Sequence, residues 1–75
     1  MEEKELIETL AEFHHDTWVD WSREISREEN ISSERFGRWT KLWIPYNELT
    51  EEEKESDRKL ANKLLDKLKN GGLVF

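Results

Sequence analysis

The two histidines of the chain are adjacent and precede an acid, in the segment His14-His15-Asp16. Histidine and carboxylate side chains are common metal ligands and acid–base catalysts. In a helix, however, adjacent side chains diverge by about 100°, so two neighbouring histidines are poorly placed to bind one metal ion. We therefore predict no metal site here. Instead, His14 is expected to make a polar contact inside the core, and His15 to point to solvent.

Five large aromatic rings come from separate segments, namely Trp18, Trp21, Trp39, Trp43 and Tyr46. A ring with one exposed face can stack a nucleobase. The alternative is that most of these rings form the hydrophobic core, since each buries a large area. Both interpretations stay open, although five rings are more than three short helices usually need.

The arginines Arg23, Arg35, Arg38 and Arg58 are candidates for contacts with phosphate or carboxylate groups. The alternative for each is a surface ion pair, which contributes little to stability. Asp57 is expected to point inward, because Leu60 and Ala61 follow it on the same helical face. An inward carboxylate needs a partner, and His14 or an arginine is the natural one. No nucleophile–base pair, glycine-rich phosphate loop or pair of catalytic acids is evident, so we predict no enzymatic activity and no catalytic residue.

Hydrophobic periodicity predicts an all-α fold, a small three-helix domain with helices at about 2–28, 33–43 and 51–69. The apolar face of the first helix contains Leu6, Ile7, Leu10, Ala11, Phe13, His14, Thr17, Trp18, Trp21 and Ile25. The buried side of the second helix should contain Phe36, Trp39 and Trp43, and that of the third Asp57, Leu60, Ala61, Leu64, Leu65 and Leu68. Residues 1–75 thus form a single domain with an aromatic core.

Local signals mark the helix ends. Ser32 or Ser33 can cap the second helix, and Thr50 with Glu53 forms a capping box for the third. Gly37 would let another element approach the second helix closely. Pro45 biases Ile44 away from helical geometry and begins a Pro-Tyr turn before the last helix. Asn70-Gly71-Gly72 should end that helix, and Leu73-Val74-Phe75 should fold back on the core or meet a neighbouring subunit.

Composition excludes several classes of protein. A chain of 75 residues forms one domain at most, and without cysteine it has no disulfide or thiolate metal site. The net charge of -6 disfavours general nucleic-acid binding, which needs basic surface. No apolar run approaches the ~20 residues that span a bilayer, and the acidic N-terminus is unlike a signal peptide. We expect a cytoplasmic protein without membrane contact.

Three segments resemble the ryanodine-receptor repeat (RyR) domain. Leu10-Ala11, His14 and Trp18 are similar to the opening helix of that family. Pro45-Tyr46-Asn47-Glu48-Leu49, Glu53-Lys54 and Asp57-Arg58 resemble its Pro-Tyr-x-x-Leu and Glu-Lys-x-x-Asp-Arg motifs. The ending Asn70-Gly71-Gly72-Leu73-Val74 is similar to its glycine-containing close. The segment from Ser33 to Trp43 departs from the Gly-Trp-x-Tyr-Gly-like segment of the receptor repeats, and is more like short free-standing RyR-like proteins of bacteria and phages.

The resemblance implies a small helical module that binds a nucleotide. Paired receptor repeats bind an adenine nucleotide between aromatic rings, and microbial RyR-like domains are linked to nucleotide signals of antiviral defence. By analogy, Trp18 would be a stacking ring, with Trp21, Trp39 and Tyr46 as further walls. This is analogy at the level of the fold.

We therefore expect a non-enzymatic, cytoplasmic binding module for a nucleotide-like small molecule, which sequesters a signal and needs no cofactor. The candidate ligand-binding residues are Trp18, Trp21, Trp39, Tyr46, His14, Arg35, Arg38 and Arg58. A homodimer or higher homo-oligomer would complete the pocket better than a monomer. The alternative is a protein–protein interaction or structural module that uses the exposed aromatic face. A regulator of DNA or RNA is disfavoured by the acidic charge.

Overall fold

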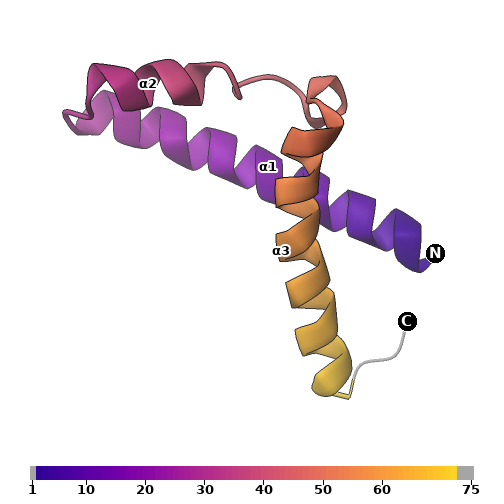
Figure 1. Ribbon diagram of the computed structural model, residues 1–75. Coiled ribbons are helices and arrows are strands. Elements are labelled where there is room, and N and C mark those ends of the chain that lie inside the picture. Colours follow the sequence, from indigo (N-terminus) through magenta and orange to yellow (C-terminus); the bar gives the residue numbers. More distant parts are fainter. Residues whose placement is uncertain (1, 73–75) are drawn as a thin grey trace.

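A computed structural model describes residues 2–72 of the chain. Its elements are the helices α1 (Glu3–Glu28), α2 (Ser33–Thr40) and α3 (Glu51–Asn70), with a 3-10 turn, η1 (Tyr46–Glu48), before α3 (Figure 1). The described part contains no strand. The prediction of an all-α, three-helix domain is confirmed.

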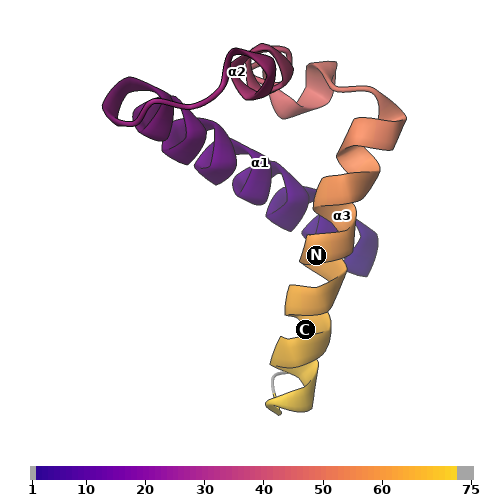
Figure 2. The ribbon, with the colours of Figure 1, turned by 60° about the vertical axis from the view of Figure 1, so that its left-hand side comes forward.

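The helices are arranged around α1, which is the longest. Figures 1 and 2 show α2 folded back over the C-terminal part of α1, while α3 crosses the N-terminal part. The contacts agree with this view, because Trp39 of α2 meets Trp18, whereas Lys69 of α3 pairs with Glu3. The result measures 43 × 24 × 15 Å and is thin in one direction. Each of the shorter helices therefore covers only one part of α1.

The buried core is small and lies where α1, η1 and α3 meet. Its buried cluster consists of Ala11, Tyr46, Leu49 and Ala61, and Leu65 is buried as well. One alanine from each of the two crossing helices lets their backbones approach closely. Among the large rings named above, only Tyr46 is buried; Trp18, Trp39 and Trp43 are half-buried and Trp21 is exposed. The prediction of an aromatic core is therefore correct for Tyr46 and too broad for the tryptophans.

The predicted helix ends are largely confirmed. The Ser32 hydroxyl accepts a hydrogen bond from the Arg35 N–H at 3.1 Å and caps α2. Thr50 and Glu53 form both bonds of the capping box. After Asn70, the backbone at Gly72 has a φ of 92°, which favours glycine. The predicted tail at 73–75 lies outside the described residues.

The second helix is shorter than predicted, and ends at Thr40 rather than at residue 43. The N–H groups of Leu42 and Trp43 donate to the carbonyls of Trp39 and Thr40, three residues back. Hydrogen bonds that span three residues, where an α-helix has bonds that span four, tighten the chain into a turn before Pro45. The expected role of Gly37 is wrong, because among the described residues nothing lies within 4 Å of a Cβ placed there.

Each helix buries a narrower part of its surface against its neighbours than the apolar face predicted from the sequence. Phe13, Phe36, Leu60 and Leu64 are exposed, although all were expected to be buried. The reason is geometric: α3 packs on the side of α1 that carries Ala11, which leaves Phe13 beside the crossing. Leu60 and Leu64 flank Ala61 on α3 and open onto the same side.

The predicted positions of the two histidines are reversed. His15 is 3% exposed, whereas the side chain of His14 is 41% exposed. The irregular segment before η1 covers the His15 side of α1, where the Ile44 carbonyl meets the imidazole and the Tyr46 ring lies 6.2 Å away. The hydrophobic pattern of α1 does not contain this information, because it depends on a distant loop.

Candidate functional site

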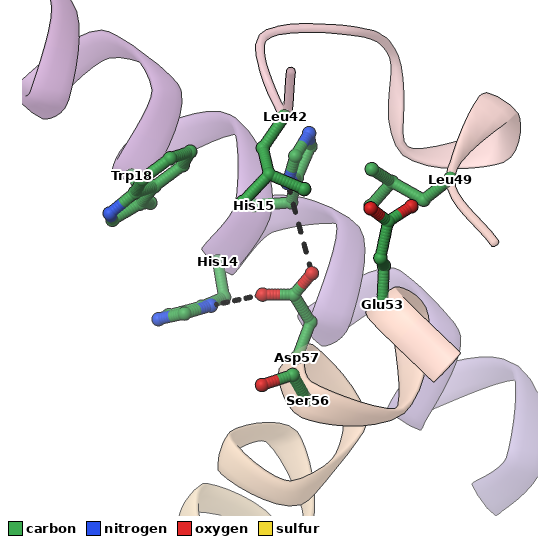
Figure 3. Close-up of a pocket in the computed structure, with 8 residues that line it drawn as sticks. All are labelled: His14, His15, Trp18, Leu42, Leu49, Glu53, Ser56 and Asp57. Carbon is green, nitrogen blue, oxygen red and sulfur yellow. Dashed lines mark hydrogen bonds and ion pairs between the residues drawn. The ribbon is translucent and has the colours of Figure 1, made fainter. Parts of the chain in front are cut away.

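A cleft of about 300 Å³ opens where α1, the segment before α3, and α3 itself come together (Figure 3). It is lined by His14, His15, Trp18, Leu42, Leu49, Glu53, Ser56 and Asp57. Its walls combine an indole ring, two aliphatic side chains, two imidazoles and two carboxylates. Such a mixture of apolar surface and a few polar groups is typical of a small-molecule site.

The polar centre of the cleft is Asp57, which lies between both histidines. The His14 Nδ1–H donates to Asp57 Oδ1 at 2.7 Å, and His15 Nδ1 lies 3.8 Å from Oδ2 (Figure 3). The carboxylate is largely buried, at 13% side-chain exposure. The prediction that Asp57 points inward and pairs with His14 or an arginine is thus confirmed, and His14 is the partner. The contact also joins α3 to α1 next to the core.

His15 is held in one orientation by the backbone. Its Nε2 lies 2.7 Å from the Ile44 carbonyl, which can only accept, so Nε2 carries the proton. The other nitrogen, Nδ1, faces Asp57. His15 Nδ1 and Asp57 Oδ2 are 3.8 Å apart, so the His15 ring lies directly behind this carboxylate. His15 therefore has a structural role in the cleft: it is buried and packs behind Asp57.

His14 has an unused acceptor. Since its Nδ1 donates to Asp57, the neutral ring presents the lone pair of Nε2 on its opposite edge. Figure 3 shows this edge turned away from Asp57. The carboxylate fixes both the tautomer and the orientation of the ring. His14 is therefore an oriented acceptor for an N–H or O–H group that enters the cleft.

The aromatic residues form a chain that begins at the cleft. Trp18 lines it and meets Trp39 edge-on, with the ring centroids 5.9 Å apart. Trp39 lies 6.0 Å from Trp21 and carries the Arg35 guanidinium 5.9 Å from its centroid. The structure thus brings together three of the predicted rings. Tyr46 is separate, because it is buried in the core and donates to Glu8.

The predicted arginines do not enter the cleft. Arg58 binds the carboxylates of Glu8, Glu51 and Glu55 on the other side of the α1–α3 crossing. These bonds raise the pKa of Arg58 further above its usual value, and the bond to Glu8 has the largest effect. Arg38 is exposed and lies 3.9 Å from Glu34. Arg35 contacts the aromatic chain at Trp39, and Arg58 acts as a clamp between helices.

Sequence reasoning did not assign six of the lining residues to the site, namely His15, Leu42, Leu49, Glu53, Ser56 and Asp57; for Asp57 it predicted only an inward position and a partner. Glu53 could have been found, because the capping box places it one turn before Asp57 on α3. Its Oε1 accepts the Thr50 N–H at 2.8 Å. Leu42 comes from the irregular segment after α2, and no sequence signal positions that segment.

Metal binding and membrane crossing find no support in residues 2–72. No three histidine, cysteine or carboxylate side chains in this range are grouped to hold a metal ion. None of the helices described there is long and apolar enough to cross a bilayer.

No family model, curated protein or solved structure matches the chain. The RyR resemblance therefore stays a prediction.

Proposed function

We propose that this chain is a non-enzymatic binding module that holds a planar, nucleobase-like heterocycle in the cleft of His14, Trp18 and Asp57. The observation that supports this proposal is the half-exposed indole of Trp18 beside an oriented acceptor, His14 Nε2. A nucleobase has a flat face that stacks on an indole, for about 1–3 kcal/mol, and N–H groups that need acceptors. The two surfaces meet both requirements.

Charge decides which part of a nucleotide enters the cleft. The lining includes the carboxylates of Glu53 and Asp57 but no lysine or arginine. A phosphate there would meet like charge. The base, not the phosphate, would therefore occupy the cleft, and the phosphate would extend along the aromatic chain towards Arg35. This assignment keeps Arg35 and Arg38 as candidate phosphate contacts and gives Arg58 a structural role.

The biological role that follows is sequestration of a nucleotide signal. The RyR resemblance points to the nucleotide signals of antiviral defence in bacteria and phages. A cytoplasmic protein would meet such signals, and a chain without cysteine suits that reducing compartment. These assignments depend on the resemblance, whereas the cleft chemistry does not.

Ligand binding can be tested by calorimetry and thermal unfolding with nucleosides and their 5′-monophosphates. We expect at least one purine or pyrimidine nucleoside to bind and, at 100 times its dissociation constant, to stabilise the fold by about 2.7 kcal/mol. Trp18→Leu should abolish binding while helicity is retained. For the nucleosides, which carry no phosphate, Trp21→Leu is the matched control, because this exposed ring lies on the same helix and does not line the cleft.

Variants of the polar residues separate base from phosphate recognition. His14→Phe should weaken nucleoside and nucleotide alike, since it removes the acceptor. Arg35→Gln should weaken only the monophosphate. If no nucleoside or nucleotide binds to the folded wild-type chain, the proposal is wrong.

A second candidate function is a protein-interaction module. The observation that favours it is the apolar side chain of Phe13, which is 69% exposed on the outer side of α1. Exposed apolar groups that form a contiguous patch mark interaction sites more often than isolated ones. A partner at this surface could be another protein or a second copy of the chain, as in the predicted homo-oligomer.

A further inference from the structure

An apolar groove lies beside the crossing of α1 and α3, and it shares His14 with the cleft. It is lined by Leu10, Phe13, His14, Thr17, Leu60, Ala61 and Leu64, and has a volume of about 230 Å³. Phe13 is 69% exposed, and Leu60 and Leu64 are each 46% exposed. Within the described chain nothing covers these three side chains. The groove is formed jointly by two helices, so its two edges belong to different elements.

The α1 edge of the groove is acidic. Glu12, Asp16, Asp20 and Glu24 follow one another at intervals of four residues and are all exposed. Side chains at this spacing form one stripe along a helix. Asp16 and Asp20 follow Phe13 by three and seven residues, so the stripe passes along the Phe13 side of the groove. On its other flank the same two carboxylates line a hollow beside Trp43 and Pro45. No ion pair within residues 2–72 involves the carboxylates of this stripe.

The α3 edge of the groove is basic. Lys59, Lys63 and Lys67 also follow one another at intervals of four, and all are exposed. Lys63 follows Leu60 by three residues, and Lys67 follows Leu64 by three. This stripe therefore borders the other side of the same groove. As with the acidic stripe, its lysines form no ion pair in the part of the chain that the structure describes.

We propose that this face binds a second copy of the chain in a two-fold symmetric dimer, with α1 of each copy against α3 of the other. In an isologous interface, each contact occurs twice by symmetry. This arrangement places the acidic stripe of one copy on the lysine stripe of its partner, twice. The apolar side chains Phe13, Leu60 and Leu64 of both copies are enclosed between the two charged borders.

Charge also selects the direction of the symmetry axis. Because α1 and α3 cross, an axis directed along or perpendicular to α1 would place α1 on α1, and the two acidic stripes would repel each other. An axis that bisects the angle between α1 and α3 instead brings unlike helices and unlike charges together. Complementary charge determines which of several apolar contacts is stable, because juxtaposed like charges disfavour the wrong arrangement. The charge pattern therefore fixes one arrangement of the dimer.

A dimer would also compensate for the small core. Among residues 2–72, only five apolar side chains are buried in the monomer, Ala11, Tyr46, Leu49, Ala61 and Leu65. A standard interface takes about 800 Å² per partner, roughly one seventh of the 5903 Å² that this chain exposes. An interface of this size would have to include both charged stripes as well as the groove, because the groove alone is lined by only seven residues.

The proposal is tested by sedimentation of the full chain over a range of concentrations, without ligand. We expect a monomer–dimer equilibrium in the wild type. Replacing two lysines by acids, in K63E/K67E, should raise the dissociation constant at least about tenfold. D16K/D20K should do the same. Combining all four substitutions in one chain should restore the dimer, because the two stripes have then exchanged two charges each.

The matched control is K4E/K41E, which changes the net charge equally at two exposed positions outside the groove. It should leave the dissociation constant within about twofold of the wild type, as expected for surface changes away from the contact. Circular dichroism verifies that each variant folds. A wild type that is monomeric at every concentration overturns the proposal and leaves the face to a different partner. A dimer that K63E/K67E does not weaken, or that the fourfold variant does not restore, overturns it as well.

Discussion

Tyr46 donates a 2.9 Å hydrogen bond from its hydroxyl to Glu8 Oε2, and this bond joins η1 to the first helix. Arg58 of α3 binds the other oxygen of the same carboxylate. One side chain of α1 thus holds two other elements. The Arg58 bond is the largest effect that lowers the pKa of Glu8; burial opposes it, and the Tyr46 bond adds to it. The network lies next to the core and away from the cleft.

Tyr46 should titrate late. Burial, and then its bond to Glu8, raises its pKa from 10.0 to about 12. Since the folded pKa is above the unfolded one, this stabilisation is complete below pH 10 and is lost as the pH rises towards 12. Tyr46 is the only tyrosine, so ultraviolet absorbance of tyrosinate reports it directly. Glu8→Gln should lower this pKa, while Glu28→Gln should not. A folded chain whose tyrosine titrates near 10 contradicts the prediction.

Glu8→Gln should also change the response to acid. The pKa of Glu8 is lowered, so its stabilisation is present above the unfolded pKa and is lost as the pH falls through the folded value. At neutral pH we expect the variant to lose about 1 kcal/mol, since Arg58 keeps two other carboxylates. The difference from wild type should narrow below about pH 4. Urea unfolding at several pH values measures this. An equal loss at every pH would show that packing, not charge, is involved.

The helix ends could be predicted from the sequence because their signals are local. Thr50 and Glu53 lie three residues apart and satisfy each other's backbone groups, and Ser32 needs only the next turn of its own helix. The Asp57–His14 contact could also be predicted, since an inward carboxylate requires a partner. In each case, chemistry within one face or one turn determines the result.

The exposed apolar residues could not be predicted, because their burial depends on where another helix crosses. Phe13 and Leu10 share one apolar face in the sequence, yet α3 packs beside Ala11 and leaves Phe13 exposed. The same limit applies to His15, which is buried by a loop whose Ile44 carbonyl lies 29 residues further along the chain. Periodicity identifies the faces of a helix, but it does not identify which face is covered.

Ser22→Ala should destabilise the contact between α1 and the segment after α2. The Trp43 indole N–H donates to the Ser22 hydroxyl at 2.9 Å, and that hydroxyl is fully buried. Removing the acceptor leaves the indole donor unpaired, for a loss of about 1–2 kcal/mol. Ser33→Ala is the control, because Ser33 is exposed. Chemical unfolding followed by near-ultraviolet circular dichroism measures both. Equal stability of the two variants would mean that water replaces Ser22 as the acceptor.

Ala61→Leu should disturb the crossing of α1 and α3 and, with it, the cleft. Ala61 is 3% exposed and packs in the same cluster as Ala11. A larger side chain there would force the helices apart, at about 1–3 kcal/mol. Because Asp57 lies one turn before Ala61, its bond to His14 should lengthen, and nucleoside binding should weaken in parallel with stability. Asp66→Leu, at an exposed position of the same helix, should change the free energy of unfolding by no more than about 0.5 kcal/mol. If Ala61→Leu unfolds like the wild type, the two backbones are not in close contact at this crossing.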